Sequence, residues 1–183
     1  YSVASRPSSK KAIELQIKLV PGGICTTYVH KHLKEGQEMT FNGPYGDFFL
    51  RDTETEMICM AIGSGMAPIK AILTHMAEHD IQRKVTYFYG ARTRADLFDV
   101  EYLESLRERL PNFTFIPLLS RPTPECCWEG ETGRINAVLP KYFPSGEGME
   151  AYLCGAPAAL DAFKEALMEI GVAEEKIYYD PFA

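Results

Sequence analysis

The chain has 183 residues, of which 46% are hydrophobic and 24% are charged. This composition is typical of a globular protein and excludes a wholly disordered chain, and the length fits one domain or two small ones. The 19 basic and 25 acidic residues give a net charge of −6, which argues against nonspecific nucleic-acid binding because that binding needs a basic face.

The first 52 residues have the pattern of a small β-rich segment. Apolar and polar residues alternate from position 12 to position 20, as in a half-buried antiparallel strand. Pro21-Gly22-Gly23 ends this pattern, a short helix is expected over residues 28–33, and a second strand over residues 39–41. Two strands are too few to close a barrel. We therefore expect a partial antiparallel β-barrel domain over residues 1–52.

Beyond residue 52, strand and helix patterns alternate to the end of the chain. Met57–Ile62 is a continuous apolar run, as a parallel strand covered on both faces requires. Further strands are expected at residues 85–89, 113–119, 151–154 and 177–179, with helices of apolar periodicity between them. This alternation predicts an α/β domain over residues 53–183, built on a five-stranded open parallel sheet with flanking helices.

A glycine-rich turn, Gly63-Ser64-Gly65-Met66-Ala67-Pro68, joins the first parallel strand to its helix. Such a turn lets backbone approach a diphosphate at the positive end of the helix dipole, although glycine is common in strand–helix turns of every kind. Cys154-Gly155-Ala156-Pro157 repeats the arrangement after the fourth strand, so both turns open onto one sheet edge. Cys154 is consistent with a position beside the reactive ring of a ligand and equally with the role of a small buried hydrophobic residue.

Two arginines follow neighbouring strands at the same edge. Ser120-Arg121 ends the third strand and Arg92 follows the second. A guanidinium there can bind a phosphate or ribose, or can be a solvated loop charge, and the residues alone do not separate the two.

One pattern formally matches a zinc motif. His75-Met76-Ala77-Glu78-His79 has the form H-x-x-E-H. Met76, however, belongs to the apolar stripe of its helix, and the other two histidines lie in the first domain. We therefore expect no metal site.

Taken in order, the motifs of this chain resemble those of the ferredoxin–NADP reductase superfamily. The residues that carry the likeness are Tyr1-Ser2-Val3-Ala4-Ser5, Gly23-Ile24-Cys25-Thr26, Gly43-Pro44-Tyr45-Gly46, the 63–68 turn, Tyr89-Gly90-Ala91-Arg92 and the 154–157 turn. Within the superfamily the chain is most similar to the reductase part of the F subunits of sodium-translocating NADH:quinone oxidoreductases. Phe48-Phe49, the 111–114 segment, the 128–133 loop and the ending Asp180-Pro181-Phe182 carry that closer likeness.

The resemblance implies a reaction centre made by four residues. Tyr1 would pack against the flavin ring, and the Ser2 hydroxyl would approach flavin N5. Cys154 would lie beside the nicotinamide, and Phe182 would cover the other flavin face. The family's flavin motif also has an arginine and further barrel strands before the Tyr-Ser pair, which is why the barrel within residues 1–52 is expected to be partial.

The resemblance also implies two sets of cofactor-binding residues. FAD would be held by Tyr1, Ser2, Val3 and Phe182 at the ring and by Gly23, Ile24, Cys25 and Thr26 at the diphosphate. NAD(P)H would be held by Gly63, Gly65, Met66, Ala67 and Pro68 at the diphosphate, by Arg92, Ser120 and Arg121 at the ribose, and by Cys154, Gly155 and Pro157 at the nicotinamide.

The function implied is that of a flavin-dependent oxidoreductase. It passes a hydride from NAD(P)H to FAD and then single electrons to a [2Fe-2S] ferredoxin-like domain or subunit. NADH is favoured on general likeness, although NADP-using relatives carry Ser-Arg where this chain has Ser120-Arg121. The reductase component of an oxygenase and a non-catalytic, regulatory NAD(P)H-binding module remain alternatives.

The expected location is the cytoplasm. Five cysteines without disulfide-framework spacing are typical of a reducing compartment. No apolar run reaches the about 18 residues that span a bilayer. An attachment to the cytoplasmic face of a membrane complex, through other subunits or upstream sequence, stays an alternative to a freely diffusing protein.

Overall fold

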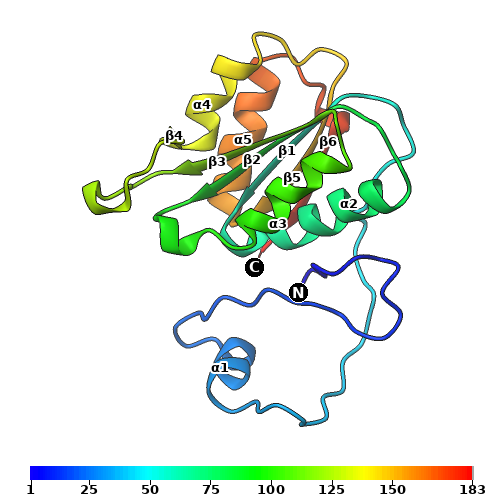
Figure 1. Ribbon diagram of the computed structural model, residues 1–183, viewed down its shortest axis with the longest axis vertical. Coiled ribbons are helices and arrows are strands. Elements are labelled where there is room, and N and C mark those ends of the chain that lie inside the picture. The colour runs from blue at the N-terminus through cyan, green and yellow to red at the C-terminus, as the bar shows by residue number, and fades with distance from the viewer. Residues whose placement is uncertain (183) are drawn as a thin grey trace.

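The computed structural model describes residues 1–182, which form an extended N-terminal segment and an α/β domain (Figure 1). The α/β domain contains a six-stranded sheet in which every pairing is parallel, in the order β4-β3-β2-β1-β5-β6. The strands are β1 (Met57–Ile62), β2 (Val85–Ala91), β3 (Phe113–Leu119), β4 (Glu131–Thr132), β5 (Glu150–Gly155) and β6 (Ile177–Pro181). The helices of this domain are α2 (Met66–Glu78), α3 (Val100–Ser105), α4 (Ile135–Tyr142) and α5 (Pro157–Glu169).

Helices cover both faces of the sheet, as Figure 1 shows. Met57, Cys59 and Ala61 of β1 pack in one core with residues of α2 and α3. Ile58 and Met60 pack in the other, with residues of α4 and α5. All five side chains are fully buried, which is why the β1 sequence is continuously apolar rather than alternating.

The five predicted strands of this domain are all present, and the structure adds a sixth. β4 pairs with β3 only through Leu118–Glu131 and Leu119–Thr132. Two residues carry no periodicity, so sequence pattern could not have revealed this strand. Within residues 1–182 no helix is both long and apolar enough to cross a membrane.

The N-terminal segment departs from its predicted secondary structure. The strands expected over residues 12–20 and 39–41 do not form, and the only antiparallel pairing in the segment is one bridge between Val3 and Leu15. The alternating residues have no neighbouring strand, so Ile13 and Leu19 remain 47% and 41% exposed. The short helix predicted over residues 28–33 is present with shifted bounds, as α1 (Ile24–Lys31), which begins directly after Gly23.

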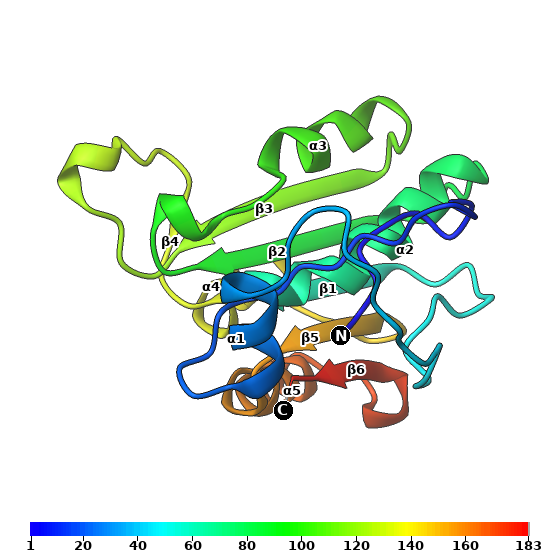
Figure 2. The same cartoon turned by 90° about the horizontal axis from the view of Figure 1, so that it is seen from below.

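The strand order places a topological switch point between β1 and β5. From β1 the chain moves outward through β2, β3 and β4, then returns to place β5 on the other side of β1. Open α/β sheets bind ligands at such a point, beyond the carboxyl ends of the strands. The N- and C-terminal ends lie close together in Figure 1, between the sheet and α1, and Figure 2 shows α1 under the sheet when the molecule is seen from below.

Candidate active site

The turn after β1 exposes backbone at the switch point. Residues Gly63–Gly65 form a single 3-10 turn, with Gly63 in the left-handed region at φ +53°. A Cβ on Gly63 would have no atom within 4 Å, so the space beside this backbone is open. The left-handed conformation and the open approach together fit a diphosphate that lies against main chain.

Gly65 brings the turns after β1 and β5 into contact. A Cβ on Gly65 would lie 2.8 Å from the Cys154 carbonyl carbon and 3.1 Å from the Gly155 nitrogen. Both neighbours are backbone of β5, so no side chain fits at position 65. The two predicted glycine turns therefore form one continuous surface at the switch point.

The first turn of α2 contributes backbone rather than side chains. Met66, Ala67 and Pro68 are all buried, and no acidic residue lies in this turn. The positive end of the helix dipole is therefore unopposed by a local carboxylate. Of the five predicted diphosphate residues, Gly63 and Gly65 lie in the preceding 3-10 turn and the other three in this one. The backbone of Gly63 has open space beside it, whereas Gly65 is packed against β5.

Cys154 lies at the carboxyl end of β5, next to Asp180 of β6. Its side chain is fully buried. Burial raises the pKa of the Cys154 thiol above its usual range, and the Asp180 carboxylate raises it further. The thiol is therefore neutral at physiological pH and is a packing group rather than a nucleophile.

The two ends of the chain meet at this edge. The Ser2 hydroxyl donates a hydrogen bond to Oδ2 of Asp180, and the Phe182 N–H donates to the Gly155 carbonyl at 3.0 Å. Ser2, Cys154 and Phe182, three of the four predicted reaction-centre residues, are thus gathered around β5 and β6. Tyr1 adjoins them and is exposed.

Asp180 is the residue that sequence reasoning missed here. It pairs in register with Cys154 and receives the Ser2 hydroxyl. The sequence shows an acid two residues before Phe182, but only the β5–β6 register places that acid beside Cys154. No local pattern carries this information.

The predicted FAD diphosphate residues lie at the start of α1. Gly23 is the N-cap, Ile24 and Cys25 are exposed, and the first turn contains no acidic residue. Thr26 is buried, and its hydroxyl accepts the Val20 N–H at 3.1 Å. This bond closes the turn before α1, and the place of Thr26 at the FAD diphosphate stays a prediction. The exposed helix N-terminus itself suits an anion.

Val3 and the three residues of the predicted ribose site are also placed. Val3 is exposed beside its bridge to Leu15. The N–H groups of Ser120 and Arg121 donate to the carbonyls of Ala91 and Arg92, each at 2.9 Å. The backbone after β3 therefore continues to pair with the backbone after β2, and the exposed Arg92 and Arg121 lie on adjacent loops. Pro157 opens α5 and is exposed.

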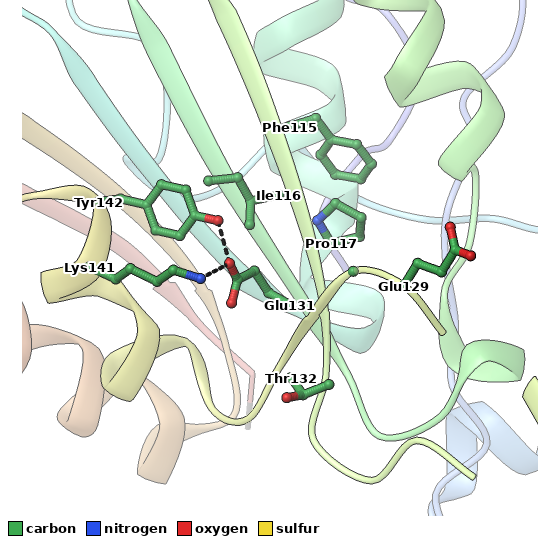
Figure 3. A pocket seen from close by; sticks show the side chains of 9 residues that line it. Phe115, Ile116, Pro117, Glu129, Glu131, Thr132, Lys141 and Tyr142 are labelled. Atoms are coloured by element: carbon green, nitrogen blue, oxygen red, sulfur yellow. Dashed lines mark hydrogen bonds and ion pairs between the residues drawn. The ribbon is translucent and has the colours of Figure 1, made fainter. Parts of the chain in front are cut away.

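A separate cavity of about 530 Å³ lies at the opposite edge of the sheet, beside β3, β4 and α4 (Figure 3). Glu131 accepts hydrogen bonds there from Lys141 and from the Tyr142 hydroxyl. These bonds hold the pKa of Glu131 below its usual range, and the Glu131 carboxylate raises the pKa of Tyr142 to about 12. The charges of Glu131 and Lys141 are thus paired with each other, and none of the predicted site residues lines the cavity.

The H-x-x-E-H helix shows two histidines in contact. The His75 and His79 rings lie 4.1 Å apart between centroids on α2. His79 Nδ1 is 3.0 Å from the His75 carbonyl oxygen. Nowhere in residues 1–182 are three or more histidine, cysteine, aspartate or glutamate side chains grouped to hold a metal ion.

Comparison with known families divides the chain into two domains. The oxidoreductase FAD-binding domain family matches residues 1–50, and the oxidoreductase NAD-binding domain family matches residues 57–165. These matches confirm the predicted cofactors, FAD and NAD(H). They also place the FAD-binding family on the segment in which little regular secondary structure forms.

Relatives and solved structures match the chain over its whole length. The reductase component DmpP of phenol 2-monooxygenase from a Pseudomonas species is 36% identical over the whole chain and 52% of the relative. The F subunit of the Na⁺-translocating NADH-quinone reductase of Methylococcus capsulatus is 36% identical over the whole chain and 48% of the relative. The Amycolatopsis cytochrome P450 reductase GcoB has a TM-score of 0.84 at 30% identity, covering the whole chain and 55% of that structure.

The chain spans about half the length of these curated relatives. A ferredoxin NADP⁺ reductase from Neisseria gonorrhoeae, solved with bound FAD and NADP, shares the fold with a TM-score of 0.75 at 20% identity, over 99% of this chain and 78% of that one. The predicted ferredoxin-reductase-like fold is confirmed. With an FAD-binding segment and an NAD-binding α/β domain that meet at the switch point, the chain belongs to the oxidoreductase NAD-binding domain family and, through it, to the ferredoxin reductase superfamily of flavin oxidoreductases.

Proposed function

We propose that this chain is an electron-transfer module that moves a hydride from NADH to FAD and passes single electrons on to an iron–sulfur centre. The observation that carries the proposal is the hydrogen bond from Ser2 to Asp180 at the β5–β6 edge. It joins the FAD-binding segment to the strand ends where Cys154 lies. Hydride transfer requires nicotinamide and flavin in direct contact, and this is the edge where both binding regions meet.

Each part of the site has a task in this proposal. FAD, when bound, accepts two electrons together and releases them one at a time. The backbone of residues 63–65 holds the NAD(P)H diphosphate, and the N-terminus of α1 holds the FAD diphosphate. Tyr1 and Phe182 flank the flavin ring. The neutral Cys154 thiol packs beside the nicotinamide and keeps water from that position.

The direct test is a visible spectrum of the chain incubated with FAD. We expect flavin absorbance that stays with the protein through gel filtration and bleaches when NADH is added without oxygen. Reoxidation by ferricyanide, a one-electron acceptor, restores the bands. Retained NADH binding without flavin binding would instead support the non-catalytic regulatory module.

The choice of coenzyme is tested at Arg121. Both Arg121 and Arg92 are exposed at the coenzyme edge, and no acidic residue follows Ser120 directly. We propose NADH as the preferred donor, with NADPH accepted through these guanidinium groups. Arg121→Ala should then lower the rate with NADPH by about tenfold, which corresponds to about 1.4 kcal/mol, and leave the rate with NADH unchanged. An unaltered ratio of the two rates would show that Arg121 does not contact the ribose phosphate.

An oxygenase reductase is favoured by the lengths of the alignments. The phenol 2-monooxygenase reductase aligns over 184 positions and the xylene/toluene monooxygenase component XylA over 183, against 183 residues in this chain. The F-subunit sequences of the quinone reductases need 196 or 197 positions, so their alignments contain insertions or gaps. We therefore propose an oxygenase reductase component as the second candidate beside the NADH-quinone reductase component.

Fractionation of source cells separates these two candidates. For an oxygenase reductase we expect the protein in the high-speed supernatant, and we expect NADH oxidation that does not depend on sodium. For a component of the quinone reductase we expect it in the membrane pellet, with quinone reduction stimulated by sodium ions.

A further inference from the structure

Lys70 of α2 links the FAD-binding segment to two parts of the NAD-binding domain. Its Nζ donates to Glu14 Oε1 at 2.7 Å and to Asp99 Oδ2 at 2.6 Å. Gln16 Nε2 donates to the same Asp99 oxygen at 3.1 Å. The side chain of Lys70 is only 11% exposed, while those of Glu14 and Asp99 are 47% and 34% exposed, so the cluster is a partly buried one with Lys70 on its inner side.

The charges of the cluster make Lys70 its centre. Burial lowers the pKa of Lys70, but its bonds to Asp99 and Glu14 outweigh burial, so the pKa lies above its usual value and the ammonium group stays protonated. Without that cation, the Glu14 and Asp99 carboxylates would face each other across the boundary between segment and domain. Their repulsion would push the segment away from the domain.

The cluster lies beside the parts of the chain that are proposed to hold the coenzyme. Lys70 is the fifth residue of α2, the helix that begins at the Gly63–Gly65 turn. Asp99 is the N-cap of α3 and ends the loop that starts after β2, where Arg92 lies. Glu14 lies opposite the start of the chain, since its carbonyl accepts the Ala4 N–H at 2.8 Å.

Lys70 makes the shorter and more extensively bonded of the two ionic links between the parts. Across residues 1–182, only the pairs Lys70–Glu14 and Arg6–Glu78 connect the segment to the domain by opposite charges. The Arg6 side chain is 63% exposed and its distance to Glu78 is 3.3 Å. Each pair has one exposed partner, but Lys70 bonds to Glu14 at 2.7 Å and also to Asp99 at 2.6 Å, so its position is fixed by two carboxylates rather than one.

We propose that Lys70 is a positioning residue for hydride transfer, which sets the separation of the FAD-binding segment and the NADH-binding turn through its bonds to Glu14 and Asp99. The inference rests on the proposed function. A misplacement of about 1 Å far from the reacting atoms can cost about a hundredfold in rate. Loss of Lys70 therefore slows hydride transfer while each cofactor still finds its own binding groups.

Rapid mixing of the FAD-loaded chain with NADH, without oxygen, tests this directly. We expect Lys70→Met to lower the limiting rate of flavin reduction by about tenfold or more, with the Kd values of FAD and NADH changed by less than about twofold. The kinetic deuterium isotope effect on flavin reduction, measured with NADH labelled at the transferred hydrogen, should be at least as large in Lys70→Met as in the native chain. Lys70→Arg should restore most of the rate, because a guanidinium can pair with both carboxylates.

Lys141→Met is the matched control. Lys141 also pairs with a glutamate, Glu131, but its side chain is 64% exposed and lies at the far edge of the sheet. We expect this variant to reduce flavin at the native rate. A Lys70→Met variant that is equally fast, or a Lys70→Arg variant as slow as Lys70→Met, would overturn the proposal.

Hydrogen exchange of the cofactor-free chain gives a second readout that needs no catalysis. We expect Lys70→Met to accelerate exchange of the Ala4 amide, which donates to the Glu14 carbonyl at 2.8 Å, and Lys141→Met to leave it unchanged. Unaltered exchange in Lys70→Met would overturn the positioning role even if the rate falls. If the native chain itself transfers no hydride, the proposed function fails, and the exchange result still decides whether Lys70 holds the segment in place.

Discussion

At the scale of single residues, the cysteines of the sheet differ in exposure from the cysteines of α1 and of the loop after β3. Cys59 and Cys154 are buried, whereas Cys25 and Cys127 are exposed. Burial raises the pKa of Cys59 to about 12, despite the nearby positive charge of Arg83. The pKa of Cys154 is raised by burial and by Asp180. A raised pKa means less thiolate at a given pH and hence slower alkylation.

We predict that iodoacetamide at pH 8 labels Cys25 and Cys127 of the native chain and spares Cys59 and Cys154. Mass spectrometry of tryptic peptides checks this, with a sample in urea as the control in which all five cysteines react. Labelling of Cys154 as fast as Cys25 in the native chain would show that the β5–β6 edge opens in solution.

The contact between the two glycine turns supplies a second test at residue scale. A Cβ at Gly65 meets the backbone of Cys154 and Gly155, which cannot rotate away. We predict that Gly65→Ala costs about 1–3 kcal/mol of unfolding free energy, the usual cost of overpacking, and weakens NADH binding. Urea unfolding and a fluorescence titration with NADH measure the two effects.

Gly90→Ala is the comparison for this substitution. A Cβ there meets side-chain atoms of Ile135 at 3.1 Å and Ile62 at 3.2 Å, which can shift. We expect a smaller loss of stability than in Gly65→Ala. Equal losses of stability in the two variants would mean that the contact between the turns does not make position 65 more sensitive to a side chain than position 90.

At the scale of elements, a buried ion pair holds residues 51–55, which lead into β1, against the sheet. Arg83, in the loop between α2 and β2, contacts Glu150 Oε2 of β5 at 3.0 Å, and both side chains are almost completely buried. The Arg83 Nε also donates to the Thr55 carbonyl at 2.9 Å and Nη1 to the Arg51 carbonyl at 3.1 Å. The pair therefore fixes residues 51–55 against the amino ends of the strands.

We predict that Arg83→Met lowers the unfolding free energy by about 3–5 kcal/mol, because it leaves the Glu150 carboxylate buried without its main partner. Replacing both residues with methionine should cost less than this single change, since no buried charge is left unpaired. Lys176, which pairs with Glu150 at 3.3 Å, also loses its partner, but its side chain is 43% exposed. Urea unfolding measures both variants. Lys84→Met, which removes an exposed partner of Glu56, should cost at most about 1 kcal/mol, and a similar loss in Lys84→Met and Arg83→Met would contradict the prediction.

Elements whose signal is local were predictable from the sequence, and those that depend on a distant partner were not. β3 was predicted with its observed bounds, Phe113–Leu119, because a buried strand is apolar whatever its neighbours are. Residues 12–20 alternate just as clearly, yet no strand forms, since a strand also needs a hydrogen-bonded neighbour.

In the candidate site, too, the local features were predictable and the contacts between distant residues were not. The glycine turns were found because their residues are contiguous, and the paired turns after β1 and β5 do touch through Gly65. The contact of Ser2 with Asp180 and the Lys70 cluster were missed. They join residues that are 178 and 56 positions apart, and only the folded arrangement brings such residues together.

At the scale of the whole molecule, the hydrophobic core belongs almost entirely to the α/β domain. Ala4 is the only buried hydrophobic residue within positions 1–52, whereas Ile13, Tyr28 and Phe41 are exposed. The N-terminal segment is thus held by polar contacts at its edges. Phe48 and Leu50 differ from the rest of the segment, because they pack against the core that contains α2 and α3.

Because of this packing, the stability of the isolated α/β domain should depend on the residue at which the fragment begins. The Arg51 N–H donates to the Tyr152 hydroxyl at 3.0 Å, and the Arg51 guanidinium lies 3.8 Å from the Phe49 ring centroid and 4.6 Å from that of Tyr178. A fragment that starts at residue 53 loses these contacts as well as Phe48 and Leu50. A fragment that starts at residue 47 keeps them all.

We predict that the fragment 47–183 unfolds cooperatively in urea with nearly the stability of the full chain, and that the fragment 53–183 is less stable by about 2–4 kcal/mol, because full burial of each apolar side chain contributes about 1.5–3 kcal/mol and these two are partly buried. Fragment 47–183 should bind NADH and no longer bind FAD. Fluorescence titration with each cofactor and urea unfolding measure these outcomes. Equal stability of the two fragments would instead place the boundary of the NAD-binding domain at residue 53, and loss of cooperative unfolding in both would show that the N-terminal segment is required for the fold.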